Sequence, residues 1–245
     1  MLIKVGALMR ESWAIYKNNF SLFLKITAWL LIPVVILSFL PYLISNSVIF
    51  LATNFFLSLL SWVFSVFISI ALVLTISALS KKESVDLRSI YNLSYSKTFW
   101  GVIVSILVTL AVGFGTLLLI IPGIIFSVWF SFSLYVFVLE NKKGTDALAR
   151  SHQLVKGRFW PVLWRWIAPN FVYGIILLIV ILIPIYIIDF AVGQPGASFT
   201  ATPPWWSVLI SNIIPVLVTP LLYAVGFILY DALKKEKETT PEKTQ

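Results

Sequence analysis

Six long apolar segments constrain this chain more than any other feature of its sequence. Each is long enough to cross about 30 Å of hydrocarbon as an α-helix, and none alternates polar with apolar residues as the strands of a membrane β-barrel do. The segments cover residues 20–44, 54–80, 100–121, 123–140, 168–192 and 206–233. The sequence therefore predicts an all-α, polytopic integral membrane protein with about six transmembrane helices.

The composition excludes several other classes of protein. Of the 245 residues, 60% are apolar and only 11% are charged, whereas about a quarter of the residues of a typical soluble domain are charged. A soluble enzyme, a disordered protein and a fibrous protein are therefore excluded. The chain has no cysteine and a single histidine, which excludes disulfide bonds, thiolate metal sites and cysteine nucleophiles.

The basic residues are all predicted to lie on one side of the membrane. The 18 lysines and arginines lie before or at the start of the first segment, between the second and third, between the fourth and fifth, and after the sixth. The opposite loops hold one charge, Asp189. Because basic loops stay inside, both termini are predicted to be cytoplasmic. The net charge of +8 then favours anionic membrane lipids, and not nucleic acid, as partners.

The apolar run over residues 100–140 is predicted to fold into a hairpin. As one helix it would be about twice as long as a membrane is thick. Pro122 breaks a helix and Gly123 permits a tight turn, so we place the turn at this pair. The other outer connectors are expected near residues 45–53 and 193–204.

The domain organisation is expected to be simple. Residues 1–233 are predicted to form a single six-span domain, followed by a short charged cytoplasmic tail at residues 234–245 with the composition of a disordered end. The charges scattered over residues 1–20 are unlike those of a secretory signal peptide, so the first segment is expected to be retained.

Amphipathic segments precede three of the apolar segments. Residues 5–20 and 146–159 each place apolar side chains on one helical face, and residues 87–91 form a weaker version. Aligning the three stretches superposes Phe20, Phe99 and Phe159. This pattern predicts three units, each an interfacial helix followed by a membrane hairpin. The alternative is that any basic amphipathic segment before a span looks alike.

A basic cluster in the third amphipathic segment is the first candidate site. It contains Lys142, Lys143, Arg150, Lys156 and Arg158. An apolar stripe is interleaved with it, consisting of Leu148, Val155 and Phe159, and His152 borders the stripe. Each basic residue near an anionic surface contributes roughly 1 kcal/mol, so we predict that the cluster contacts anionic headgroups on the cytoplasmic side. The alternative is that these charges only set the topology.

Four polar residues are further candidates. Asn170 and Asn212 lie within spans, where they could form an intramembrane polar site between helices five and six or hydrogen-bond between helices. Glu140 could bind an ion or a headgroup, or pair with nearby lysines. Asp189 could gate a pathway or bind a cation, although a residue in an outer loop usually faces water. No catalytic motif is found, so no catalytic residue, metal or cofactor is assigned.

Residues 117–163 combine several features in a distinctive order. An apolar run enters Pro122-Gly123, a span ends at Glu140, and an amphipathic helix precedes Phe159. That helix contains Ala147, Arg150, Ser151 and Gly157. This arrangement resembles the membrane domain attached to some bacterial glycerophosphoryl diester phosphodiesterases, and related small six-span inner-membrane proteins. The resemblance implies a bacterial-type plasma membrane but no activity, since the chemistry of that family belongs to a separate soluble barrel whose catalytic residues have no counterparts here.

These observations predict a non-catalytic membrane module that acts in envelope or lipid homeostasis through contacts with lipids or with a protein partner of unknown identity. The alternative is a transporter or lipid translocator with a site between the proline-interrupted helices five and six. A water-filled cavity at mid-membrane that reaches Asn170 or Asn212 would favour the transporter, whereas a solid apolar bundle with basic interfacial helices would favour the module.

Overall fold

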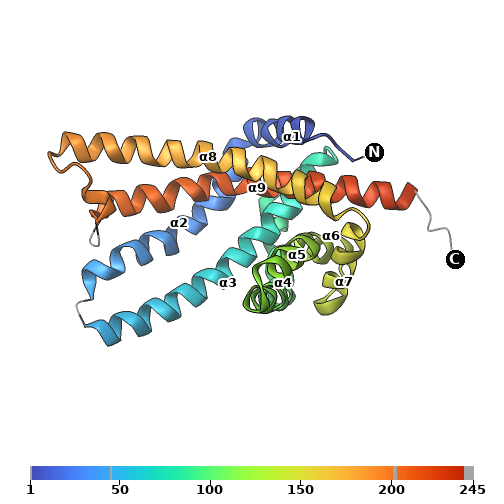
Figure 1. Cartoon of the computed structure of the whole chain (residues 1–245), viewed down its shortest axis with the longest axis horizontal. Helices are drawn as coiled ribbons and strands as arrows, with labels where there is room; N and C mark the ends of the chain where they lie inside the picture. Colours follow the sequence, from blue (N-terminus) through green and yellow to red (C-terminus); the bar gives the residue numbers. More distant parts are fainter. Residues whose placement is uncertain (1, 45, 201–202, 240–245) are drawn as a thin grey trace. The chain divides into compact units, whose positions relative to one another are not determined.

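The computed structural model describes residues 2–44, 46–200 and 203–239. Within these ranges the chain is helical and contains no β-strand (Figure 1). The elements are α1 (Val5–Asn18), α2 (Phe20–Leu43), α3 (Ser47–Ser80), α4 (Leu87–Leu118), α5 (Ile120–Phe130), α6 (Ser133–Glu140), α7 (Gly144–Val155), α8 (Phe159–Ala191), the short 3-10 helix η1 (Ala197–Phe199) and α9 (Trp205–Thr239). Six stretches are long and apolar enough to cross a membrane, with α5 and α6 together forming the fourth. The predicted all-α polytopic membrane protein is confirmed.

The described residues group into two compact units. Unit 1 contains residues 2–19, 66–169 and 221–239, and unit 2 contains residues 20–65 and 170–220 apart from those outside the described ranges. The long helices α3, α8 and α9 each contribute one part to each unit. The two units are compact parts of the chain, and this division does not test whether residues 1–233 form one domain. The single six-span domain over residues 1–233 therefore stays a prediction.

The turn between the third and fourth spans lies upstream of the predicted position. Leu119 is extended (φ −165°, ψ 153°) and separates α4 from α5. Pro122 and Gly123 instead lie in the first turn of α5. Our placement of the turn at this pair was wrong. The N–H groups in the first turn of a helix have no intrahelical partner, so a proline there costs no hydrogen bond.

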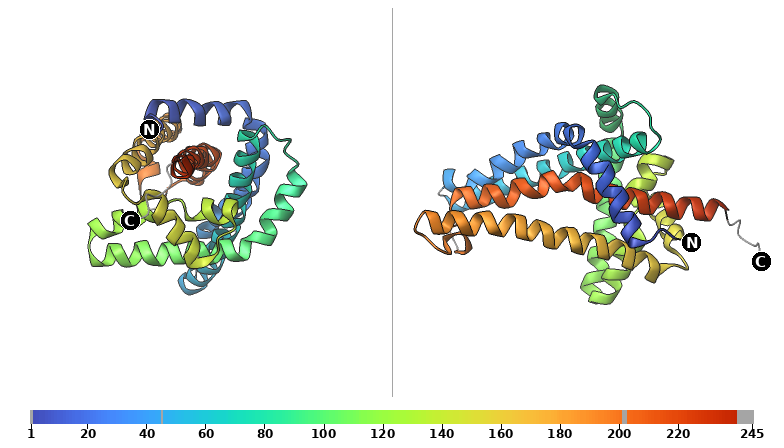
Figure 2. Two further views of the ribbon diagram at one scale, coloured as in Figure 1. Left: turned by 90° about the vertical axis from the view of Figure 1, so that its right-hand side faces the viewer. Right: turned by 90° about the horizontal axis from the view of Figure 1, so that it is seen from above.

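Glycines bring the two arms of this hairpin close together, and α4 and α5 lie side by side (Figure 2). A Cβ atom on Gly115 would lie 2.7 Å from a ring carbon of Phe126 and 3.2 Å from the backbone of Gly123. A Cβ atom on Gly123 would clash with Thr116 of α4. Small residues are typical of helix contacts in membranes, because close approach increases van der Waals contact where no hydrophobic effect draws helices together.

Two of the three predicted amphipathic segments form separate helices, α1 and α7, and Gly157 (φ 81°) follows the end of α7. The second segment continues from Leu87 into α4 without a break, so the separate helix predicted there is wrong. Asp86 caps α4 by accepting hydrogen bonds from the backbone N–H groups of Arg88 (3.2 Å) and Ser89 (3.1 Å). The Ser89 hydroxyl also donates to it and is the main reason that the pKa of Asp86 lies below its usual value. The threefold repeat stays a prediction.

The connector between α2 and α3 is shorter than predicted. The helix α2 ends at Leu43, and α3 begins at Ser47, inside the connector expected near residues 45–53. Asn46 explains the early start, because its side chain accepts a hydrogen bond from the backbone N–H of Val48 (3.0 Å), as helix-capping residues do.

The last helix also extends beyond its predicted end. We expected a disordered tail from residue 234, but α9 continues to Thr239. An ion pair between Lys235 and Asp231 (2.6 Å), one helical turn apart, supports the additional turns. The rest of the predicted tail, residues 240–245, lies outside the described residues.

Candidate functional site

The fourth span is interrupted between α5 and α6, and a serine of α7 fills the interruption. Ser151 donates a hydrogen bond to the carbonyl oxygen of Trp129 (2.7 Å) and accepts one from the backbone N–H of Phe132 (3.2 Å). Ser151 is fully buried. Without it these two backbone groups would lose a hydrogen-bond partner, and each unsatisfied group would lower stability by about 1–3 kcal/mol. The neighbouring His152 packs on Trp129 with 4.5 Å between ring centroids. These contacts hold α7 against the fourth span.

The buried face of α7 differs from the predicted stripe. The buried residues are Ala147, Ser151, Leu154 and Val155. Of the predicted stripe, Val155 is buried, whereas Leu148 and Phe159 are only half-buried. The prediction was partly wrong because α7 packs against α4, α5 and α6, and the small side chains of Ala147 and Ser151 permit that contact.

Glu140, the last residue of α6, accepts two hydrogen bonds from distant parts of unit 1. Its Oε2 atom lies 3.1 Å from Nε of Arg150, and its Oε1 atom accepts from the Tyr230 hydroxyl at 2.8 Å. The Glu140 side chain is 11% exposed and that of Arg150 is 21% exposed, so water screens this pair less than a surface ion pair. The alternative in which nearby lysines pair with Glu140 was wrong, because α7 folds back and presents Arg150.

Three tyrosines extend this polar contact into the spans. The Tyr135 hydroxyl donates to the carbonyl oxygen of Tyr223 (3.1 Å), and the Tyr223 hydroxyl is hydrogen-bonded to that of Ser69. The rings of Tyr135 and Tyr230 stack with 5.9 Å between centroids. A buried hydroxyl in a membrane is costly unless it is paired, and each of these hydroxyls has a partner. The cluster joins α3, α6 and α9 within unit 1.

The tyrosine cluster was not predicted from the sequence, although α9 carries a signal for it. Tyr223, Gly226 and Tyr230 are spaced i, i+3 and i+7, which places them on one face of a helix. The Tyr135 hydroxyl lies against Gly226, where a Cβ atom would clash with it. A glycine between two tyrosines on one face therefore marks the close contact, but the sequence does not show which helix supplies Tyr135.

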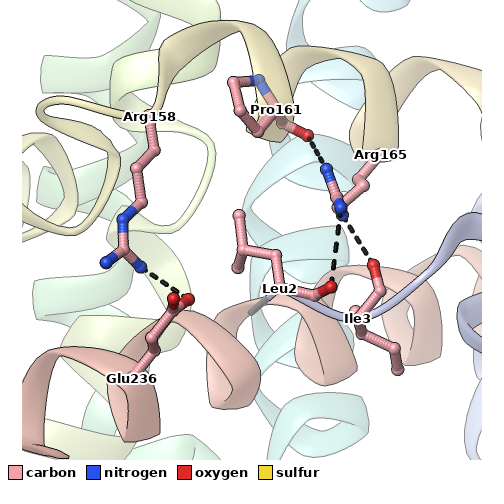
Figure 3. Close-up of polar contacts among 6 residues, drawn as sticks. All are labelled: Leu2, Ile3, Arg158, Pro161, Arg165 and Glu236. Atoms are coloured by element: carbon pink, nitrogen blue, oxygen red, sulfur yellow. Dashed lines mark hydrogen bonds and ion pairs between the residues drawn. The ribbon is translucent and has the colours of Figure 1, made fainter.

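The predicted lipid-contact residues separate into two groups. Lys142, Lys143 and Lys156 are exposed at the two ends of α7, and the Lys143 ammonium lies 5.1 Å from the centre of the Trp100 ring. The two arginines have protein carboxylates as partners. Arg150 is paired with Glu140, and Arg158 lies 2.6 Å from Glu236 of α9 (Figure 3). The structure does not bring all five basic residues together as one free cationic surface.

Two further basic residues, which we had considered only as determinants of topology, bind backbone carbonyl groups. Arg165 donates to the carbonyl oxygens of Ile3 (2.6 Å) and Pro161 (3.0 Å), as Figure 3 shows. Lys97 donates to the carbonyl oxygen of Val138 (2.9 Å) and to the Asn141 side chain. Arg165 thus anchors the N-terminal segment to α8, and Lys97 ties α4 to the end of α6.

The two intramembrane asparagines lie in unit 2. Asn212 is exposed and donates to the carbonyl oxygen of Val208 in its own helix (2.7 Å) and to the Ser38 hydroxyl (3.4 Å). It lines a groove of about 480 Å³ formed by α2, α9 and Pro203. Asn170 is half-buried in α8 and does not line that groove. The groove therefore pairs Asn212 with α2, whereas we predicted a site between helices five and six.

Asp189 does not face water. It is fully buried, and its carboxylate accepts hydrogen bonds from the backbone N–H of Ser198 (3.2 Å) and from the Ser198 hydroxyl (2.8 Å). The expectation of a solvent-facing carboxylate was wrong because the loop that follows α8 folds back over the end of that helix. The two hydrogen bonds from Ser198 stabilise the Asp189 carboxylate, and they also hold the loop that contains Ser198 against α8.

The site has the character of a packed polar core. Among residues 2–44, 46–200 and 203–239, no three histidine, aspartate or glutamate side chains are grouped as metal ligands.

Comparisons with curated proteins and with solved structures gave no match. The family model described as the membrane domain of glycerophosphoryl diester phosphodiesterase matches residues 101–244, more than half of the chain. This match confirms the resemblance found in the sequence, and the chain belongs to the glycerophosphoryl diester phosphodiesterase membrane-domain family.

Proposed function

We propose that this protein is a non-catalytic module of a bacterial-type plasma membrane that binds anionic lipid headgroups, with both termini in the cytoplasm. Its headgroup contacts are Lys142, Lys143 and Lys156. In this role the module supports envelope or lipid homeostasis. The family supports the membrane setting, since its model describes a membrane domain.

One observation carries the proposal: the exposed lysines lie at the two ends of a helix that is held in place by buried bonds. Ser151 and Arg150 attach α7 to the fourth span. Lys142 and Lys143 precede α7 and Lys156 follows it, and all three are exposed. Because the helix is already fixed, binding at these ammonium groups does not require ordering of its backbone, and only the lysine side chains lose conformational freedom. Each contributes roughly 1 kcal/mol near an anionic surface.

The buried polar groups of unit 1 support a non-catalytic role, because they are already hydrogen-bonded within the protein. Glu140 already accepts from Arg150 and Tyr230, and the Tyr135 hydroxyl donates to a backbone carbonyl. A general acid or base must reach a substrate proton, and these groups are bound inside the protein. They support packing of the module.

The test compares two triple variants in nanodiscs that contain phosphatidylglycerol. Replacing Lys142, Lys143 and Lys156 by Gln should weaken retention of the anionic lipid at low salt by about 100-fold, since three contributions of roughly 1 kcal/mol are removed. The matched variant with Arg at all three positions keeps the charge and should retain the lipid like the parent. Native mass spectrometry measures the retained lipid. Equal retention by the Gln variant would refute the proposal.

The orientation is tested separately with reporter fusions. A fusion at the C-terminus should be active only with a cytoplasmic reporter, and one near Gly196 only with a periplasmic reporter, because the basic residues precede and follow the spans on one side. A periplasmic reporter that is active at the C-terminus would overturn the proposed orientation.

A further inference from the structure

A small cavity with both polar and apolar lining residues lies in unit 1 among the end of α3, Leu139 of α6 and the last turns of α9. Its volume is about 280 Å³. Ser77, Ser80 and Lys81 line it from the α3 side, and Asp231, Lys234 and Lys235 line it from α9. These residues come from two stretches that are predicted to face the same side of the membrane. The cavity therefore combines ammonium and hydroxyl groups where the spans end.

The charges around the cavity do not cancel. Asp231 is paired with Lys235 at 2.6 Å. Within the described ranges, neither Lys81 nor Lys234 has a carboxylate within ion-pair distance. Three lysines and one aspartate leave an excess of positive charge on the lining. An anion placed there would be attracted by at least two ammonium groups.

The donors identify the chemistry of the anion. The cavity is lined by ammonium groups from the end of α3 and from α9 and by the hydroxyls of Ser77 and Ser80, and these donors suit a ligand that carries several acceptor oxygens on one centre. A phosphate group has that geometry and one or two negative charges. We propose that this cavity binds a phosphate group, carried by either a phospholipid headgroup or a small free phosphate ester.

Helix stabilisation is the competing explanation for these lysines. Basic residues near a helix C-terminus interact favourably with the helix dipole, and α3 ends at Ser80. Lys82 offers the matched control. It is exposed at the end of the same helix, next to Lys81, but it does not line the cavity. Loss of charge at Lys82 affects the dipole without affecting the cavity.

The experiment uses the full chain in phosphate-free maltoside micelles. One arm titrates inorganic phosphate and follows binding by phosphorus NMR, and the other adds phosphatidylglycerol and follows bound lipid by native mass spectrometry. The variants are K81Q/K234Q, the control K82Q, and S80L, which places a larger apolar side chain at an exposed lining residue of the cavity without changing charge. K81Q/K234Q should bind about 10- to 30-fold more weakly than the parent. S80L should also bind more weakly, whereas K82Q should match the parent.

The two arms identify the source of the phosphate group. If K81Q/K234Q and S80L weaken the binding of inorganic phosphate while K82Q does not, the cavity is assigned to a free phosphate ester. If these variants weaken the binding of the lipid alone, the cavity is assigned to a phospholipid headgroup. Equal binding by K81Q/K234Q and K82Q in both arms would overturn the inference. The thermal unfolding midpoint of each variant checks folding, and S80L tests the cavity even if the double variant is unstable. Lys142, Lys143 and Lys156, which flank α7, are unchanged here, so this result is independent of the proposed function.

Discussion

Unit 1 and unit 2 differ in what holds their helices together. Unit 1 contains the Arg150–Glu140 pair and the glycine contact at Gly123, both between separate helices. In unit 2 few apolar side chains are buried, whereas most of the buried apolar residues of the described chain lie in unit 1. Gly174 of α8, in unit 2, has no atom within 4 Å of its Cβ position. Apolar surface does not select a partner helix in lipid. Unit 1 is therefore specified by polar bonds and close contacts, whereas unit 2 leaves apolar faces for lipid to cover.

The largest expected effect comes from breaking the ion pair of unit 1. Arg150→Gln should lower the free energy of unfolding in micelles by about 2–4 kcal/mol, because Glu140 keeps its charge in a largely buried place without its cation. Lys156→Gln, at an exposed position of the same segment, should change it by less than about 0.5 kcal/mol.

A double-mutant cycle sharpens this prediction. The variant with both Arg150→Gln and Glu140→Gln should lose less stability than the sum of the two single variants, because neither charge is left alone. Additive losses in equilibrium unfolding would mean that the two side chains do not act as a pair.

A matched pair of glycine substitutions compares a close helix contact of unit 1 with an open position of unit 2. Gly123→Ala should destabilise the protein by about 1–3 kcal/mol, because the new methyl group would clash with Thr116 of the facing helix. Gly174→Ala meets open space and should be neutral or stabilising by up to about 1 kcal/mol, since alanine favours a helix. Thermal unfolding of both variants in one detergent measures the difference. Equal destabilisation would remove the proposed distinction between tightly and loosely packed helices.

The smallest effect is expected at the polar contact of unit 2. Asn212→Ala should lower the free energy of unfolding by less than about 0.5 kcal/mol, because the side chain is exposed and bonds mainly to its own helix, at Val208. Chemical unfolding followed by tryptophan fluorescence provides the measurement. A loss of more than about 1 kcal/mol, comparable to that of a buried hydrogen bond, would show that Asn212 ties α9 to α2 as firmly as the bonds of unit 1 tie their helices.

The candidate site was only partly predictable. Arg150 and Glu140 were both candidates from the sequence. However, Arg150 was predicted to contact lipid headgroups, and nearby lysines were considered as the ion-pair partners of Glu140. Their actual contact depends on α7 folding back onto the fourth span, which Ser151 stabilises. Nothing in local spacing distinguishes an arginine that faces lipid from one that faces a carboxylate ten residues away.

The sequence by itself determined the six membrane helices, the all-α class and the family, because hydrophobicity adds up along a segment whatever its neighbours are. Tertiary structure alone decided the turn at Leu119, the burial of Asp189 and the partner of Tyr135. Each of these depends on which distant groups meet, and a buried polar group or a close contact takes its energy from that partner. The length and apolar character of a span are local properties, whereas the pairing of its polar side chains belongs to the folded chain.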